Sequence, residues 1–186
     1  MSPWRMMNEW GVPTVYLESL LYKFVKRLEE KGEFIPSCSI AGGIALEDHI
    51  FKAIALGAPY IKAVCMGRAS LAAAMVGKTQ GQLLAETYGQ GSGEYQEALL
   101  RTFVGAAPLK ERYGADSARI PPAAIAVYTY YDRLATGLRQ LMAGARKFAL
   151  TFMSRNDLMA LTREAADVSG IPYVMEADME EAERIL

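Results

Sequence analysis

Two short glycine turns are the residues whose type and spacing most clearly predict chemistry. Gly42-Gly43 and Gly67-Arg68 each follow a β-prone run and come directly before a predicted helix. Because neighbouring parallel strands end at the same edge of a sheet, the backbone N–H groups of both turns can point into one space. The positive end of the second helix and the Arg68 guanidinium favour an anion there. Either turn alone would be typical of an ordinary tight turn, but the pair predicts a phosphate site.

The elements that would position these turns alternate between strand and helix. β-prone runs predict strands at 14–17, 35–40 and 60–65. Apolar residues at helical spacing predict helices at 17–28, 47–56 and 69–76. Strands joined through helices by short connections indicate parallel βαβ units. The sequence therefore predicts an α/β fold, namely the last three βα units of a partial TIM-type (β/α) barrel.

The pattern changes after residue 77. Residues 78–93 are polar and rich in glycine, which predicts a loop. Helices are predicted beyond it at 94–103, 108–113, 121–146 and 158–168, followed by an acidic amphipathic tail. We therefore divide the chain into residues 1–77, the βα units, and residues 78–186, a loop and an all-helical C-terminal extension. The extension is expected to pack on the βα units, so that the whole forms one structural domain.

The segment SIAGGIALEDHIFKAIALGAPYIKAVCMGRA resembles the last two strands of FMN-dependent oxidoreductase barrels. The later segments YTYYDRLATGLRQLMAG and SRNDLMAL are similar to the tail of the FMN domain of glutamate synthases. In that family a strand, a Gly-Gly turn, a helix, a second strand and a Gly-Arg or Gly-Thr turn follow in this order. The resemblance implies an FMN phosphate held by Gly42, Gly43, Gly67 and Arg68, with the backbone of Ala41 and Met66 nearby.

Three departures from that family limit what the resemblance implies. Ala41 stands where the hydroxy-acid oxidases of the superfamily have Asp, and residues 68–93 contain none of the cysteines that ligate an iron–sulfur cluster in glutamate synthases. The barrel strands that supply most catalytic groups are missing, so no catalytic residue is named. The implied reaction is reduction of the imine formed from 2-oxoglutarate and ammonia, in glutamate biosynthesis. We expect that it requires a complete barrel and that this chain alone does not catalyse it.

Two other readings stay open. Inosine-monophosphate-dehydrogenase-like barrels also hold a phosphate on glycine turns, but this chain lacks their Gly-flanked cysteine loop. A truncated half-barrel could instead serve as an assembly or interaction module that binds no flavin. A predicted open sheet would expose an inner face, with Val15, Leu17, Ile40, Ile61 and Ala63. We therefore expect association, either of two copies or with a chain that supplies the N-terminal half of the barrel.

The composition excludes several classes of function. The chain has 186 residues, a formal net charge of −1, 52% hydrophobic and 22% charged residues, so neither disorder nor a nucleic-acid partner is expected. Charged residues interrupt every apolar run before the roughly 18–20 residues that a membrane helix needs, and no signal peptide is expected, since no positively charged start leads into an apolar run. Two cysteines and one histidine predict no zinc or iron–sulfur site. A soluble, cytoplasmic protein is expected.

The remaining reactive side chains are expected to be structural. His49 follows the Gly42-Gly43 turn on the next predicted helix and is expected on its surface. Cys38 and Cys65 belong to predicted strands and are expected to be small buried residues without a lowered thiol pKa. The three tyrosines of the long predicted helix are expected to pack rather than to stack on a ligand; they are Tyr128, Tyr130 and Tyr131.

Overall fold

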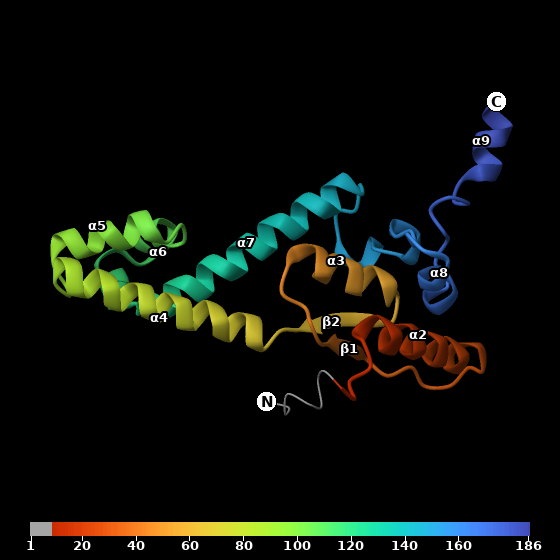
Figure 1. Ribbon diagram of the computed structural model, residues 1–186, viewed down its shortest axis with the longest axis horizontal. Coiled ribbons are helices and arrows are strands. Elements are labelled where there is room, and N and C mark those ends of the chain that lie inside the picture. Colours follow the sequence, from red (N-terminus) through yellow and green to blue (C-terminus); the bar gives the residue numbers. More distant parts are fainter. Residues whose placement is uncertain (1–8) are drawn as a thin grey trace. The chain divides into compact units, whose positions relative to one another are not determined.

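The computed structural model describes residues 9–186, and over these residues the chain is mostly helical, with eight α-helices and one sheet of two short strands (Figure 1). The α/β class is thus confirmed, whereas a third strand is absent from the described residues. The chain divides into two compact units. The first unit joins residues up to Cys65 with Arg139–Leu186, and the second is Met66–Leu138.

The sheet of the first unit follows the predicted strand–helix–strand order. Strands β1 (Cys38–Ala41) and β2 (Ile61–Cys65) are parallel and are connected through helix α3 (Glu47–Leu56). The predicted helix at 47–56 is confirmed with its bounds, and α3 buries six of its ten residues. Glu47 and Asp48 lie in the first turn of α3, where the partial positive charge of the helix N-terminus stabilises carboxylates.

The predicted strand at 14–17 is wrong, because these residues begin helix α2 (Thr14–Glu30). The backbone N–H groups of Tyr16 and Leu17 both donate to the carbonyl of Pro13, which starts the helix. Apolar residues at helical spacing continue to Leu28, so the helical pattern of the whole segment outweighs the β preference of Thr14 and Val15, although Val25 is its one buried apolar residue. The helix ends before Gly32, whose φ is 70°.

The exposed inner face that the sequence predicts for an open sheet is found only in part. Val15 and Leu17 are exposed, but on a helix, and Ile40 and Ile61 are buried strand residues. Of the predicted set, only Ala63 is an exposed strand residue.

The C-terminal part of the first unit packs on α2 and α3. Helix α8 (Arg163–Ser169) contacts α2, and a short 3-10 turn at Arg155–Asp157 contacts α3. Ser154 and Asp157 form a capping box, but it caps this turn instead of the helix predicted at 158–168. A second 3-10 turn spans Leu150–Phe152, and the predicted acidic tail forms helix α9 (Met179–Ile185).

The second unit is entirely helical. It contains α4 (Arg68–Tyr88), α5 (Gly93–Thr102), α6 (Ala106–Tyr113), a 3-10 turn at Gly114–Arg119 and the first part of α7 (Pro122–Gly144). Its core holds one continuous group of buried side chains, Tyr95, Leu99, Phe103, Ala106, Leu109, Ile125 and Ala126.

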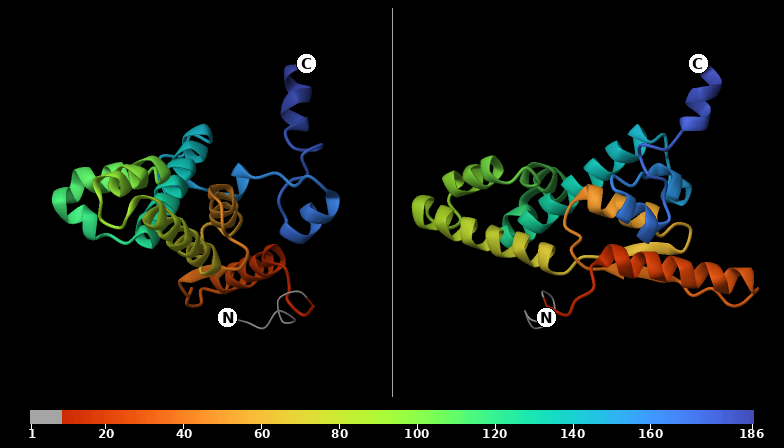
Figure 2. Two further views of the ribbon diagram at one scale, coloured as in Figure 1. Left: turned by 60° about the vertical axis from the view of Figure 1, so that its left-hand side comes forward. Right: turned by 45° about the vertical axis from the view of Figure 1, so that its right-hand side comes forward.

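The loop predicted over residues 78–93 is mostly wrong, since α4 continues to Tyr88. Gly89 ends this helix, whereas Gly77 and Gly81 lie within it and bring it close to the start of α7 (Figure 2). A Cβ at Gly77 would lie 2.4 Å from Cβ of Ala126, and one at Gly81 would lie 2.4 Å from the ring of Pro122. The predicted division of the chain between residues 77 and 78 falls inside this helix.

None of the helices in the part of the chain that the structure describes is long and apolar enough to cross a membrane.

Candidate functional site

The Gly42-Gly43 turn lies where the sequence predicts it, directly after β1. Ala41, the last residue of β1, pairs with Cys65, the last residue of β2, so both strands end at the same edge of the sheet. Gly42 has φ 129° and Gly43 has φ 71°, a backbone region that favours glycine. The hydroxyl of Thr14 donates to the carbonyl of Gly42 at 2.9 Å, which ties the turn to the start of α2.

The second predicted turn follows β2 without an intervening residue. Met66 and Gly67 come directly after Cys65 and open the second unit, and Arg68 is the exposed first residue of α4. The first turn of α4 contains no acidic residue, so its partial positive charge is not neutralised by a carboxylate of its own.

The three glycines of the two turns differ in the space that surrounds them. A Cβ at Gly43 or at Gly67 would meet no heavy atom within 4 Å, whereas a Cβ at Gly42 would lie 2.5 Å from the Thr14 hydroxyl. Gly42 therefore serves the packing of the turn on α2, whereas Gly43 and Gly67 each border space that no protein atom occupies. The structure joins Ala41, Gly42 and Gly43 in one turn and Met66, Gly67 and Arg68 in the other.

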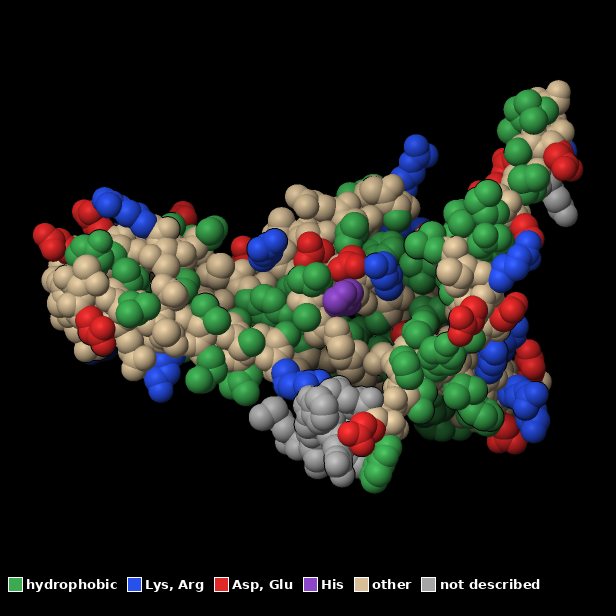
Figure 3. All heavy atoms as spheres, viewed as in Figure 1, with side chains coloured by type: hydrophobic (Ala, Val, Ile, Leu, Met, Phe, Trp, Pro, Cys, Tyr) green, Lys and Arg blue, Asp and Glu red, His purple; other side chains and the backbone are tan. Residues whose placement is uncertain are grey.

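Sequence reasoning missed a second feature of the first unit, a cavity of about 540 Å³ beside the Gly42-Gly43 turn. Its wall comes from α2, the turn after β1, α3 and the segment that leads into α8. In the view of Figure 3, hydrophobic side chains gather over the region of α2 and α8. Glu18 of α2 lines this cavity and is only 3% exposed.

The carboxyl group of Glu18 is buried, with a raised pKa and with one oxygen that lacks a hydrogen-bond partner in the part of the chain that the structure describes. Among the described residues, its Oε1 atom has no hydrogen-bond partner. Burial raises the pKa of Glu18 to about 7, and the nearby positive charge of Arg155 opposes this shift. The spacing of seven residues between Glu18 and the buried Val25 places both on one face of α2, which is the sequence signal that could have identified it.

Arg155 connects three elements of the first unit close to this cavity. Its guanidinium donates to the carbonyl of Leu56 at 2.5 Å and to the carbonyl of Ser169. It also lies over the ring of Tyr22, 3.9 Å from the ring centre. These contacts hold the C-terminus of α3, the end of α8 and the middle of α2 together, and burial lowers the pKa of Arg155.

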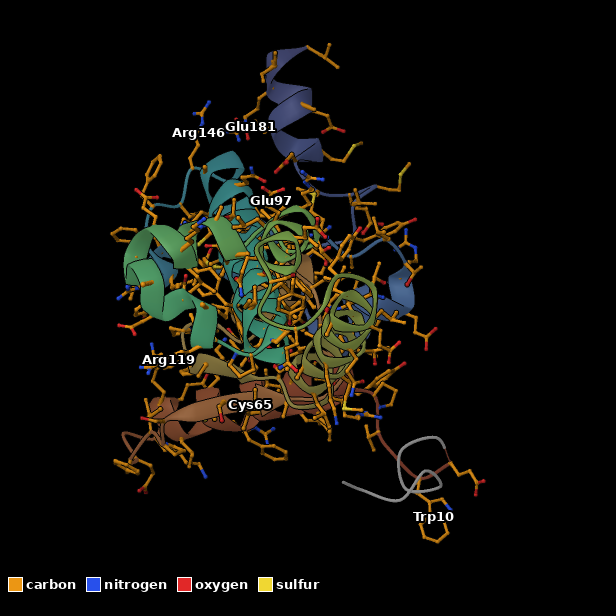
Figure 4. The ribbon with its side chains drawn as sticks, turned by 90° about the vertical axis from the view of Figure 1, so that its left-hand side faces the viewer. Trp10, Cys65, Glu97, Arg119, Arg146 and Glu181 are labelled. Carbon is orange, nitrogen blue, oxygen red and sulfur yellow. The ribbon has the colours of Figure 1, made fainter. Side chains whose placement is uncertain are left out.

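The other residues singled out in the sequence have structural contacts. His49 is half-buried on α3, lines the cavity and accepts a hydrogen bond at Nδ1 from the backbone of Ala45, at 3.3 Å. Cys65 is exposed at the end of β2 (Figure 4) and Cys38 is half-buried, so the prediction that both are buried is wrong. Exposure of Cys65 follows from its place at the end of a strand in a sheet of two strands.

Among the tyrosines of α7, packing is confirmed for Tyr128, whereas Tyr131 is exposed. Tyr128 packs against the core of the second unit, and the Tyr131 hydroxyl lies 2.6 Å from that of Ser70. The rings of Tyr130 and Tyr131 meet edge to face, with centres 5.5 Å apart. Within residues 9–186, no three His, Cys, Asp or Glu side chains are grouped as ligands for a metal ion.

Comparisons with protein-family models, with curated proteins and with solved structures find no match to this chain.

Proposed function

We propose that this chain carries the FMN-phosphate-binding turns of a glutamate-synthase-like oxidoreductase, as the final βα units of a (β/α) barrel. The observation that carries the proposal is the pairing of Ala41 with Cys65. This pairing starts two glycine turns from neighbouring positions at the carboxyl ends of parallel strands, which is where open α/β sheets and (β/α) barrels bind phosphate groups.

The local backbone supports this proposal. Gly42 and Gly43 both have positive φ, and a side chain at Gly43 or Gly67 would enter space that the protein itself does not use. Arg68 adds a guanidinium, which can donate two parallel hydrogen bonds to a phosphate. FMN, when bound, would supply the hydride and electron transfer of an oxidoreductase. The residues of this chain would hold its phosphate, and the rest of the barrel would supply the catalytic groups.

Titration of the full chain with FMN tests this proposal, with binding measured as the quenching of flavin fluorescence. We expect Gly67→Val to reduce FMN affinity at least about tenfold, because its side chain occupies the anion space without contacting another part of the protein. Gly43→Val should have a similar effect. Gly93→Val is the matched control, since a Cβ at Gly93 also meets no heavy atom within 4 Å but lies at the start of α5.

The outcome distinguishes the three readings of the sequence. Unchanged FMN affinity in both turn variants would refute the phosphate site. Stronger binding of inosine monophosphate than of FMN, lost in the same variants, would favour the nucleotide-binding barrel. Absence of binding for both compounds would favour an interaction module without flavin.

We further propose that the chain associates with a second copy or with a chain that completes the barrel, in the cytoplasm. Leu17, Leu20 and Phe24 of α2 are each 45% or more exposed, although they follow one another at helical spacing. Each strand of the described sheet also has a neighbour on one side only. Exposed apolar residues and open strand edges are typical of interfaces.

Light scattering of the purified chain tests this association. A mass at least twice that of one chain at micromolar concentration is expected for a self-associating protein. A monodisperse single chain of 20.4 kDa that unfolds cooperatively would contradict self-association. It would leave the completing chain as the remaining form of the proposal, to be tested by co-purification with an N-terminal half-barrel.

A further inference from the structure

The cavity that contains Glu18 has the size and the wall of a small-molecule site. Its volume of about 540 Å³ lies within the range of about 300–1,000 Å³ that is typical of ligand pockets. Most of its wall is aliphatic, with side chains of Val15, Ile44, Leu56, Leu158, Leu161 and Ile171. All of these residues belong to the first unit.

The hydroxyl groups of the wall already have partners within the protein. The Thr14 hydroxyl donates to the carbonyl of Gly42, and the Ser169 hydroxyl donates to the carbonyl of Ala165. The Thr162 hydroxyl accepts from the backbone N–H of Ala165 at 3.1 Å. None of these groups therefore requires a ligand.

The nitrogen-containing side chains at or near the cavity also have hydrogen-bond or ion-pair partners within the protein. His49 Nδ1 accepts from the backbone of Ala45, and the Lys52 ammonium lies 2.7 Å from Asp48 Oδ2. Arg155, whose positive charge acts on Glu18, donates to two backbone carbonyls.

Glu18 differs from these groups. Its side chain is nine-tenths buried or more, and within the described residues its Oε1 atom accepts no hydrogen bond. A buried carboxyl oxygen without a donor is unfavourable, because it has lost its hydration without a replacement. A donor that enters the cavity would restore this hydrogen bond, and a positively charged donor would do so most strongly.

We propose that this cavity binds a small organic amine, whose apolar body lies against the aliphatic wall and whose ammonium group donates to Glu18. The cavity shares Gly42 and Gly43 with the first proposed phosphate turn, but its Glu18 belongs to α2 and the ligand would need neither phosphate nor flavin. The proposal concerns the class of ligand, an apolar primary amine of about ten heavy atoms, a size that such a volume accommodates.

Calorimetric titration of the full chain with 2-phenylethylamine tests the proposal, with 2-phenylethanol and 3-phenylpropionate as compounds of similar shape but different head group. We expect the amine to bind at least about tenfold more tightly than the alcohol, and the carboxylate not to bind. Glu18→Gln should reduce amine affinity about tenfold, because it removes the negative charge and keeps the shape. Glu30→Gln, an exposed change on the same helix, should leave the affinity unchanged.

A second variant separates loss of the ligand from loss of the fold. Ala165 lines the cavity from α8, and Ala165→Leu keeps the helix while adding volume to the wall. It should weaken amine binding with an unchanged circular dichroism spectrum. Equal binding of amine and alcohol, or amine affinity that is unchanged in Glu18→Gln, would overturn the proposal, as would absence of binding to the amine.

Discussion

The contacts that stabilise the first unit differ in kind from those that stabilise the second. In the first unit, side chains form polar contacts between residues far apart in the sequence. Arg155 donates to Leu56, 99 residues away, and the Tyr60 hydroxyl donates to Glu29, 31 residues away. In the second unit most side-chain hydrogen bonds join residues three or four apart on one helix, and the helices meet through apolar side chains and glycines.

This difference indicates where each unit is sensitive to change. An all-helical unit satisfies its backbone locally, so its stability depends on how closely the helices approach each other. The first unit has a short sheet and several irregular segments, which leave carbonyl groups that long side chains must satisfy. We therefore expect steric changes to be most harmful in the second unit, and polar changes to be most harmful in the first.

The largest effect is expected from Gly77→Val in the second unit. The added Cβ would lie 2.4 Å from Cβ of Ala126 and 2.8 Å from the carbonyl oxygen of Pro122, and the backbone atom cannot move without shifting α7. We expect a loss of about 3–4 kcal/mol in unfolding free energy, measured by urea denaturation. Gly93→Ala, at a position with no neighbour within 4 Å, is the control and should stabilise slightly. Equal stability of the two variants would mean that α4 and α7 do not pack closely.

Arg155→Met tests whether loss of a polar side chain is especially harmful in the first unit. This change keeps an unbranched chain over Tyr22 but removes the donors to Leu56 and Ser169 and the cation near Glu18. We expect a loss of about 3 kcal/mol in unfolding free energy. Arg101→Met, which removes an exposed i,i+4 ion pair with Glu97 in the second unit, should cost less than about 0.5 kcal/mol. Similar losses in the two variants would contradict the contrast between the units.

Glu18→Gln should change how the stability depends on pH. Because the pKa of Glu18 is raised from its usual 4.5 to about 7, the folded protein holds this proton more tightly than the unfolded chain. Stability is therefore lost as the pH rises from about 4.5 to 7 and Glu18 ionises among Arg155, His49 and Lys52.

The variant cannot ionise, so it should be more stable than the parent by about 2 kcal/mol at about pH 8 and nearly equal to it at about pH 5. Thermal unfolding at both pH values measures this difference. A stability difference that is the same at both pH values would show that Glu18 has an ordinary pKa.

The smallest effect is expected where the two units are alike, at local helix caps. The Ser92 hydroxyl accepts from the N–H of Tyr95 at 3.0 Å in the second unit, and the Thr162 hydroxyl accepts from the N–H of Ala165 at 3.1 Å in the first. Ser92→Ala and Thr162→Ala should each cost about 1 kcal/mol in unfolding free energy. A clearly larger loss in one of them would indicate that its cap also supports tertiary packing.

Several elements follow from the sequence alone, because their determinants are local. The apolar spacing of Ile50, Ala53 and Ile54 after the acidic Glu47 and Asp48 predicts α3 with its observed bounds. The run at 60–65 and the two glycine turns are also found where they are predicted, since strand preference and, at Gly42 and Gly43, positive φ depend on the residues themselves. The phosphate role of these turns stays a prediction.

Tertiary structure decided where α2 begins, how far α4 extends and which side chains are buried, because contacts between distant residues outweighed local preference. Thr14 and Val15 favour a strand, but they begin a helix of 17 residues that contacts α3, α8 and β1 in the first unit. Gly77 and Gly81 suggest a loop, but they lie in a helix because Pro122 and Ala126 need the space that a side chain would occupy. The burial of Glu18 depends likewise on α3 and on residues more than 130 positions later in the chain. Sequence alone thus determined elements with local signals, whereas only the assembled fold decided which residues came close enough to form a cavity or a helix crossing.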